Sequence, residues 1–233
     1  MNDLERYESR YFCDSQLSNS VEGILDSLGV LTRIFYSLPI TETIYFTHDQ
    51  KEGYKFPDGM MVRLRRYVAI LSETMEIFED PILLEIKRDD RASGVNIKER
   101  VSVPGTDAIK AIVGEENRLN LRQRISIPIN QNLLPTIATQ SYRCHWIHQS
   151  GLRVTLDKNV RFFLLKKGSY TARIVESLGE GKLEFKFPKD NRHNMILARQ
   201  IVSACGCIKR PQDYLKRRAI ECIMKYMDEK VGH

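Results

Sequence analysis

Charged and apolar residues alternate in many short segments of this chain. Arg63 and Arg65 flank Leu64, and Glu85 precedes Ile86 and Lys87. Because successive side chains of a β-strand point to opposite faces, this alternation predicts half-buried strands. We expect strands at residues 5–12, 41–47, 61–70, 82–88, 95–103, 122–128, 135–147, 152–165, 171–176 and 182–187.

Helical spacing of apolar residues is found in fewer segments. We expect helices at residues 16–27, 107–113, 195–204 and 211–229, the last with Pro211 in its first turn. Asp58 and Gly59 suggest a hairpin turn between two strands. No repeat or flexible linker interrupts the pattern. The sequence therefore predicts one domain over residues 1–233, of the α+β class with mostly antiparallel strands.

Composition narrows the class of protein. The chain has 233 residues, of which 28% are charged and 42% hydrophobic, which excludes a disordered chain. No apolar run approaches the ~18 residues of a membrane span, and the charged N-terminus is unlike a secretory signal, so we expect a cytoplasmic protein. The five cysteines lack zinc or disulfide spacing, which predicts buried, reduced thiols.

The charged positions of the strands are the candidates for ligand binding. The net charge is +6, from 36 basic and 30 acidic residues. Arginine recurs at the charged positions, and its guanidinium group suits bidentate contacts to phosphate. Glu8, Glu85 and Glu184 each lie two residues from a cation. If the sheet closes into a barrel, this lining would need an anion, and a carboxylate or two could hold a divalent metal.

The order of these segments resembles a known family. The segments are RYESRY (6–11), VRLRRY (62–67), LEIKR (84–88), KER (98–100), YR (142–143), LRVTLDKN (152–159) and LEFK (183–186). Together they resemble the VTC (vacuolar transporter chaperone) domain of the CYTH-like superfamily of triphosphate tunnel metalloenzymes. The resemblance covers roughly residues 6–219. It implies a closed eight-stranded antiparallel tunnel barrel with a charged interior and a few covering helices.

The resemblance also implies an activity. It suggests a polyphosphate polymerase-like phosphotransferase that uses Mn²⁺ or Mg²⁺ and moves the γ-phosphate of ATP onto polyphosphate. The expected ligands are ATP, triphosphate or polyphosphate. The residues that would clasp phosphate oxygens in catalysis are Arg63, Arg65, Lys87, Arg143 and Arg153. The residues that would extend the substrate lining are Arg10, Lys98, Arg100, Lys186 and Lys216, and the metal ligands would be Glu184 and Glu8.

Three alternatives stay open. Hydrolases of the superfamily usually begin Glu-x-Glu-x-Lys, whereas Arg6, Glu8 and Arg10 stand here, which favours transfer over a two-metal hydrolytic site. A triphosphatase acting on tripolyphosphate, a nucleotide or an RNA 5′-triphosphate is nevertheless the first alternative, and a non-catalytic polyphosphate-binding module the second. The third, a nucleic-acid-binding β-domain, lacks aromatic residues that alternate with the basic ones, so no stable nucleic-acid binding is expected.

Two further features have simple interpretations. Cys144 and His145 are adjacent on a predicted strand, so they point to opposite faces and do not form a nucleophile–base pair. His145 is expected on the polar face. The basic helix at 211–229 is best read as an amphipathic cap, with substrate closure as the second interpretation.

Overall fold

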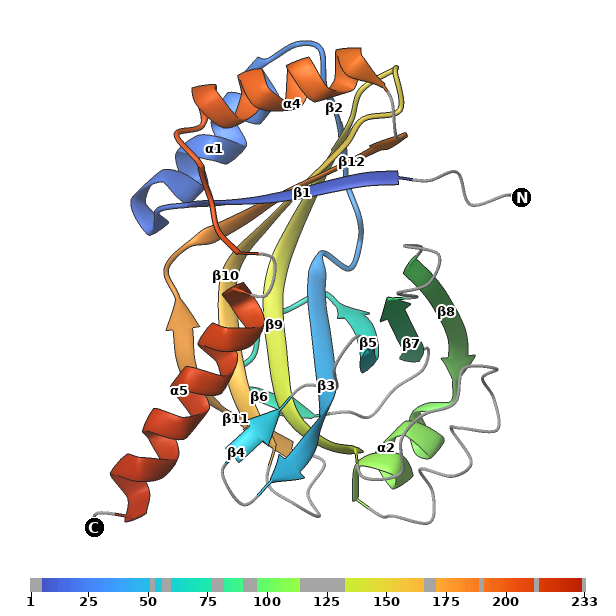
Figure 1. The fold of residues 1–233 in the computed structure, drawn as a ribbon, viewed down its shortest axis with the longest axis vertical. Helices are drawn as coiled ribbons and strands as arrows, with labels where there is room; N and C mark the ends of the chain where they lie inside the picture. Colours follow the sequence, from blue (N-terminus) through green and yellow to red (C-terminus); the bar gives the residue numbers. More distant parts are fainter. Residues whose placement is uncertain are drawn as a thin grey trace. The chain divides into compact units, whose positions relative to one another are not determined.

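The computed structural model describes residues 6–50, 53–55, 60–76, 82–89, 96–113, 133–165, 171–188, 191–211 and 214–231 (Figure 1). The strands are β1 (Arg6–Cys13), β2 (Thr32–Ile34), β3 (Ile40–Gln50), β4 (Gly53–Lys55), β5 (Met60–Val68), β6 (Thr74–Glu76), β7 (Ile82–Asp89), β8 (Asn96–Val103), β9 (Leu133–Ile147), β10 (Arg153–Leu165), β11 (Thr171–Leu178), β12 (Gly181–Pro188) and β13 (Ile208–Lys209). The helices are α1 (Ser15–Ser27), α2 (Gly105–Val113), α4 (Arg192–Ala204) and α5 (Tyr214–Val231).

The alternation of charged and apolar residues located most of the strands. Each predicted strand has its counterpart except 122–128, which lies outside the described residues, as does the predicted turn at 58–59. The unpredicted strands β2, β4, β6 and β13 are two or three residues long, too short to show a period. All four helices are present, but α5 begins at Tyr214, whose amide donates to the Pro211 carbonyl at 3.0 Å. Pro211 therefore precedes the helix instead of lying in its first turn.

The strands form one mostly antiparallel sheet of 13 strands. Its hydrogen-bonded order is β13-β1-β12-β10-β9-β3-β5-β7-β8, with the short strands and β11 attached beside this path. Among the described strands, no ladder joins β13 to β8. The predicted α+β class is thus confirmed, while the sheet has more than eight strands and a closed barrel is not shown.

The chain divides into two compact units, which we call unit 1 and unit 2. Unit 1 comprises Met1–Ile40, Ser141–Val160 and Ser177–Tyr214, and unit 2 comprises Thr41–Gln140, Arg161–Glu176 and Leu215–His233. The long strands β9 and β10 contribute residues to both units.

In unit 1, helices α1 and α4 cover one face of the sheet (Figure 1). Their apolar side chains, including Leu25 and Ile201, pack against Trp146, Leu183 and Phe185. These side chains are all buried. Because strand residues alternate between faces, burial of one set leaves the neighbouring charged set on the opposite face. Helix packing therefore decides which face of unit 1 carries the charges.

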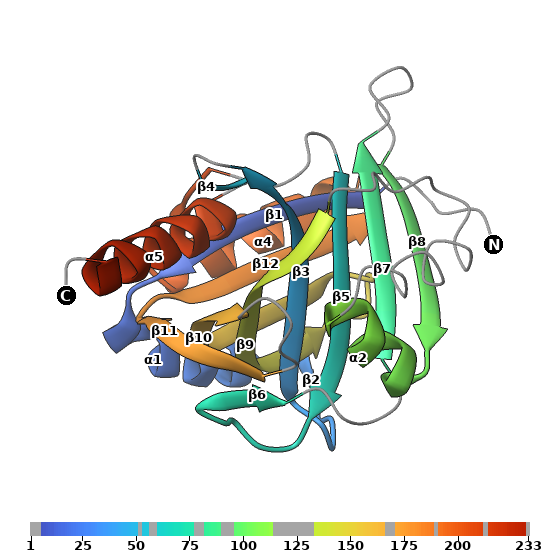
Figure 2. The ribbon, with the colours of Figure 1, turned by 90° about the horizontal axis from the view of Figure 1, so that it is seen from below.

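In unit 2, helix α2 lies beside β5 and β7 (Figure 2), and Ala108 of this helix belongs to the core of the unit. Val62 and Leu64 of β5 and Leu84 and Ile86 of β7 are buried in the same core. The intervening charged residues again lie on the other face. The sheet of each unit thus packs apolar residues on one side and carries these charges on the other, as the alternation predicts. In unit 2 the ion pair between Arg66 and the buried Glu42 is the exception, since it lies on the apolar side.

Two expectations from composition can also be compared with the structure. All five cysteines are buried, as predicted, and none of them is joined in a disulfide. Within the described ranges, no helix combines the length and apolar character needed to cross a bilayer.

Candidate functional site

A cluster of cations surrounds one carboxylate in unit 2. Glu85 of β7 is only 2% exposed, and it lies in register with Arg63 of β5 and Arg100 of β8. Arg63 donates from Nε to Glu85 Oε2 at 2.7 Å, and Arg100 donates from Nε to Oε1 at 2.7 Å. Three adjacent strands therefore bring these side chains together through their pairing register.

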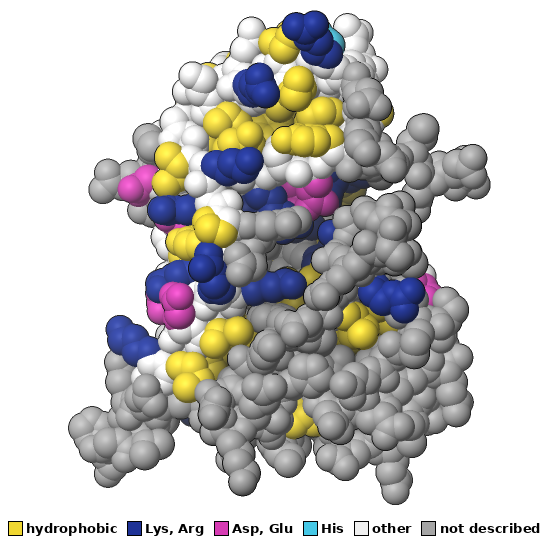
Figure 3. Space-filling model, in the orientation of Figure 1, with side chains coloured by type: hydrophobic (Ala, Val, Ile, Leu, Met, Phe, Trp, Pro, Cys, Tyr) yellow, Lys and Arg dark blue, Asp and Glu magenta, His cyan; other side chains and the backbone are white. Residues whose placement is uncertain are grey.

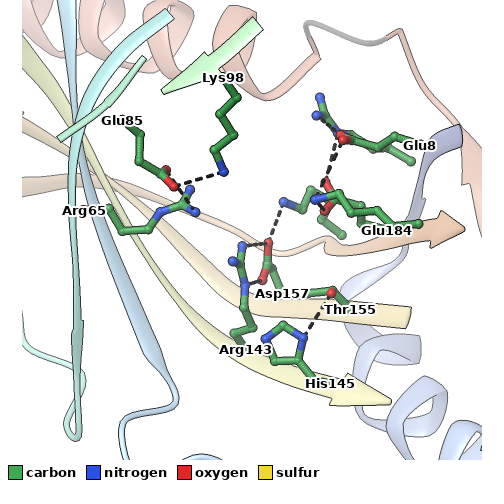
Figure 4. Close-up of polar contacts among 12 residues, drawn as sticks. Glu8, Arg65, Glu85, Lys98, Arg143, His145, Thr155, Asp157 and Glu184 are labelled. Carbon is green, nitrogen blue, oxygen red and sulfur yellow. Dashed lines mark hydrogen bonds and ion pairs between the residues drawn. The ribbon is translucent and has the colours of Figure 1, made fainter. Parts of the chain in front are cut away.

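Two more cations complete this Glu85 cluster (Figure 4). Arg65 Nη1 lies 3.3 Å from Glu85 Oε2, and Lys98 Nζ lies 3.2 Å from Oε1. Burial by itself would raise the pKa of Glu85, but the charges of Arg63, Arg65 and Lys98 outweigh it and hold the pKa far below its ordinary value. Burial, with Arg100 as a like-charged neighbour, lowers the pKa of Lys98. One ionised carboxylate thus faces four cations, which leaves an excess of positive charge.

Lys87 adds to this excess. It pairs in register with Lys98, on the same face as Glu85. Within the described ranges, no ion pair involves Lys87. The polar face of unit 2 is therefore short of negative charge, and a bound anion would supply it.

A second cluster occupies the polar face of unit 1, and here the carboxylates are more numerous. Glu184 of β12 accepts from Arg10 Nε at 3.1 Å and from Lys186 Nζ at 2.6 Å. Glu8 of β1 pairs with the same two cations, directly with Arg10 and at 3.7 Å with Lys186 Nζ. The antiparallel register places Arg10 opposite Glu184 and Glu8 opposite Lys186. We call these four residues the Glu184 cluster.

Asp157 of β10 lies next to this cluster and is 3% exposed. Arg143 of β9 binds it through two nitrogens, with Nε at 2.5 Å from Oδ1 and Nη2 at 2.8 Å from Oδ2. Lys182 Nζ lies 2.5 Å from Oδ2. Burial opposes ionisation of Asp157, but Arg143 and Lys182 hold its pKa far below the ordinary value. The pKa of Glu184 is also held well below its ordinary value, because the charges of Lys182, Lys186 and Arg10 outweigh the effect of burial.

His145 lies at the edge of these charges. Its Nδ1 is 3.2 Å from the hydroxyl of Thr155, which pairs in register with Glu184. Burial lowers the pKa of His145 to about 4, helped by the positive charge of Arg143, so the imidazole is neutral at pH 7. Arg153 is exposed on the same face, and no ion pair of the described residues involves it. The expectation that His145 lies on the polar face is confirmed.

The Glu184 cluster is the better candidate for a divalent cation. Glu8 and Glu184 share two cationic partners, which places their carboxylates close together. Carboxylate oxygens suit Mg²⁺ and Mn²⁺, and such ions usually take one or two carboxylates plus phosphate oxygens. Among the described residues, no group of three or more acidic, histidine or cysteine side chains has ligating geometry. The two carboxylates therefore fit a metal whose other ligands would be substrate oxygens.

The structure distributes the predicted site residues between the units. Unit 1 contains Glu8, Arg10, Arg143, Arg153, Glu184 and Lys186, and unit 2 contains Arg63, Arg65, Lys87, Lys98, Arg100 and Lys216. Lys216 is half-buried on α5. The sequence prediction omitted Lys182 and gave no role to Glu85 or Asp157. Strict use of the two-residue period would have found Lys182, which shares a strand face with Glu184 and Lys186.

Comparison with solved structures finds related folds. HpAC1, a putative adenylyl cyclase from Hippeastrum with a dominant triphosphatase activity, has a TM-score of 0.56 at 11% identity, over 89% of this chain and 91% of that chain. The PH1819 protein from Pyrococcus horikoshii OT3 has a TM-score of 0.46 at 14% identity, over 90% and 96% of the two chains. A chain of the Schizosaccharomyces pombe Mediator head module has a TM-score of 0.47 at 9% identity, over 86% and 96%.

The first of these similarities concerns the fold alone, and the other two are too low to support an inference. Sequence comparison finds no matching family model and no matching curated protein. The similarity to HpAC1 is one of fold and identifies no family or branch.

Proposed function

We propose that this protein catalyses metal-dependent phosphoryl transfer from a bound triphosphate, with hydrolysis as the reaction. The observation that carries the proposal is that cations gather on the polar face of each unit: four meet the buried Glu85 in unit 2, and Arg10 and Lys186 meet Glu184 in unit 1. A linear triphosphate carries several negative charges on closely spaced oxygens. Arginines with planar, bidentate donors match that group in charge and geometry.

The arginines and lysines would bind and orient the phosphates. Phosphoryl transfer depends mostly on positioning and on stabilising the charge of the transferred group. Arg63 and Arg65 already donate toward Glu85 from two neighbouring positions, so their guanidinium groups are held before any substrate arrives. Lys87 and Arg153, which have no ion-pair partner among the described residues, would contribute further positive charge without breaking an existing pair.

The Glu184 cluster would hold the divalent metal. Glu184 would be the principal ligand and Glu8 the second, and the metal would neutralise negative charge on the phosphate oxygens. Arg10 and Lys186 now neutralise these carboxylates. With a metal held by Glu184 and Glu8, Arg10 and Lys186 would be able to bind phosphate oxygens.

Hydrolysis is preferred to synthesis because HpAC1, which shares the fold, has a dominant triphosphatase activity. Polyphosphate synthesis from ATP, the activity of the VTC branch, is the second candidate. The sequence RYESRY favours it, since Arg6 stands where hydrolases of the superfamily usually carry a carboxylate. A closed tunnel barrel and a single domain over residues 1–233 belong to the same proposal.

The test is product analysis with the full chain. We would incubate the protein with Mn²⁺ and either inorganic tripolyphosphate or ATP, then measure orthophosphate release and separate the products by chain length. Release of orthophosphate without longer chains is expected. Accumulation of long polyphosphate from ATP would overturn hydrolysis in favour of synthesis, and binding without any turnover would overturn both.

Two variants separate an enzyme from a binding module. Arg143→Ala and Glu184→Ala should both lower turnover, whereas a binding module would need the arginine and tolerate loss of the glutamate. Arg199→Ala and Glu221→Gln are matched controls, because both residues are exposed on helices away from the strand clusters. Tripolyphosphate hydrolysis that survives Glu184→Ala would contradict the metal role assigned to Glu184.

A further inference from the structure

The segment after β2 carries an aromatic side chain next to the charged face of unit 1. Tyr36 is 50% exposed, and its ring centroid lies 4.9 Å from that of His145 in a T-shaped contact at 68°. A T-shaped contact occupies at most one face of the tyrosine ring. The remaining exposed surface of Tyr36 is available to another flat ring.

The pairing of β2 with β9 explains why Tyr36 lies on this face. Ile34 is in register with His145, and Arg33 with Trp146. Arg33 lies 5.4 Å from the ring of the core residue Trp146, on the side covered by α1. Tyr36 follows Ile34 by two positions and meets the histidine on the polar face. Phe35 lies 5.0 Å from the Arg33 guanidinium, which marks it as belonging to the other side.

The position of His145 connects this aromatic pair to the phosphate-binding residues. Its hydrogen bond to Thr155 joins it to the strand position opposite Glu184. Arg143, Arg153 and Lys186 are all near enough to disfavour protonation of its ring. A neutral imidazole supports the tyrosine ring without placing a fixed charge beside it. An aromatic surface therefore adjoins a set of cations within one compact unit.

We propose that Tyr36, supported by His145, stacks against the base of a nucleoside triphosphate whose phosphates lie on the cations of unit 1. The substrate class would then be nucleoside triphosphates and not bare inorganic polyphosphate. This inference rests on the proposed function, since it assigns the substrate of the same site. Stacking on one ring tolerates any base, so no preference for adenine is implied.

Exposure alone does not identify Tyr36. Apolar side chains are exposed at many places on this chain (Figure 3), and single exposed aromatics are ordinary. Phe35, at 81%, is even more exposed than Tyr36. The distinguishing feature of Tyr36 is its contact with a histidine that lies among phosphate-binding candidates. Phe35 therefore serves as the matched control.

The experiment compares two ligands across three variants. Equilibrium binding of ATP and of inorganic tripolyphosphate would be measured, with Mn²⁺, for the wild type, Tyr36→Ala, Tyr36→Phe and Phe35→Ala. Loss of one base–aromatic stack should raise the Kd of Tyr36→Ala for ATP about 5- to 100-fold, and leave tripolyphosphate within about twofold. Tyr36→Phe, which keeps the ring, and Phe35→Ala should both bind ATP like the wild type.

The outcomes separate this inference from the proposed function. Equal losses for both ligands, or no loss of ATP affinity in Tyr36→Ala, would overturn the stacking role while leaving a triphosphate site in place. A wild type that binds neither ligand would overturn the proposed function itself. A larger loss in Phe35→Ala than in Tyr36→Ala would assign the base to the other side of the segment and reject the inference.

Discussion

The two units differ in how many carboxylates accompany the cations on their polar faces. In unit 2, one carboxylate, Glu85, pairs with Arg63, Arg65, Lys98 and Arg100. In unit 1, carboxylates and cations alternate, with Glu8, Asp157 and Glu184 set among four cationic partners. The unit 2 face has excess positive charge, whereas the unit 1 face is closer to balance.

This difference indicates that the two faces favour different ligands, an anion in unit 2 and a metal in unit 1. A face with excess cations gains most from an anion, because the anion relieves repulsion among groups already in place. A metal would be favoured where carboxylates now pair with side-chain cations, as in unit 1. With the metal on the carboxylates, those cations would be able to bind phosphate. We therefore assign binding of an anion to the Glu85 cluster, and binding of a metal together with phosphate oxygens to the Glu184 cluster.

The largest expected effect is on turnover in unit 2. Arg63→Ala should lower kcat/KM for triphosphate hydrolysis about 10²- to 10³-fold, the loss typical of one preorganised charge-stabilising donor. The melting temperature should change little, since Glu85 keeps three other cations. Steady-state kinetics and thermal melting would check both, with Arg199→Ala as control. Unchanged kinetics would show that the Glu85 cluster takes no part in turnover.

The next effect is on stability in unit 1. Arg143→Ala removes the bidentate partner of the buried Asp157, and Lys182 alone would remain. We expect a loss of about 3 kcal/mol in the free energy of unfolding, the lower end of the range for breaking a buried ion pair. Urea denaturation would measure it. A loss similar to that of Arg63→Ala would show that the two faces do not differ in this respect.

The metal requirement should distinguish two glutamates. Glu184→Gln should raise the Mn²⁺ concentration needed for half-maximal activity at least about 10- to 100-fold. Glu85→Gln is the matched variant, since it removes a carboxylate of similar burial from the other cluster. It should leave the Mn²⁺ requirement unchanged. Equal shifts in both variants would contradict the assignment of metal to unit 1 alone.

The smallest effect concerns the ionisation of His145. Burial and Arg143 lower its pKa to about 4, against 6.5 for the unperturbed group. Because the unfolded chain then binds the extra proton, this histidine lowers the free energy of unfolding as the pH falls from about 6.5 toward 4. NMR titration of the imidazole would test the value. A midpoint near 6.5 would show that neither burial nor the positive charge of Arg143 acts on the ring.

The sequence located the elements because burial of one strand face imposes a two-residue period. LEFK at 183–186 shows it directly, since Leu183 and Phe185 are buried while Lys186 is not. The same period placed Arg143, Arg153 and Glu184 on the polar face. The two- or three-residue strands gave no such signal, and Lys182 was omitted although the period applies to it.

Pairing between distant strands could not be read from the chain. The meeting of Arg10 with Glu184 depends on the register of β1 against β12, and that of Arg143 with Asp157 on β9 against β10. The period fixes which face a residue occupies, since it follows from backbone geometry within one strand. Only the tertiary structure decided which charges become partners, because register is set by packing and hydrogen bonding between strands far apart in sequence.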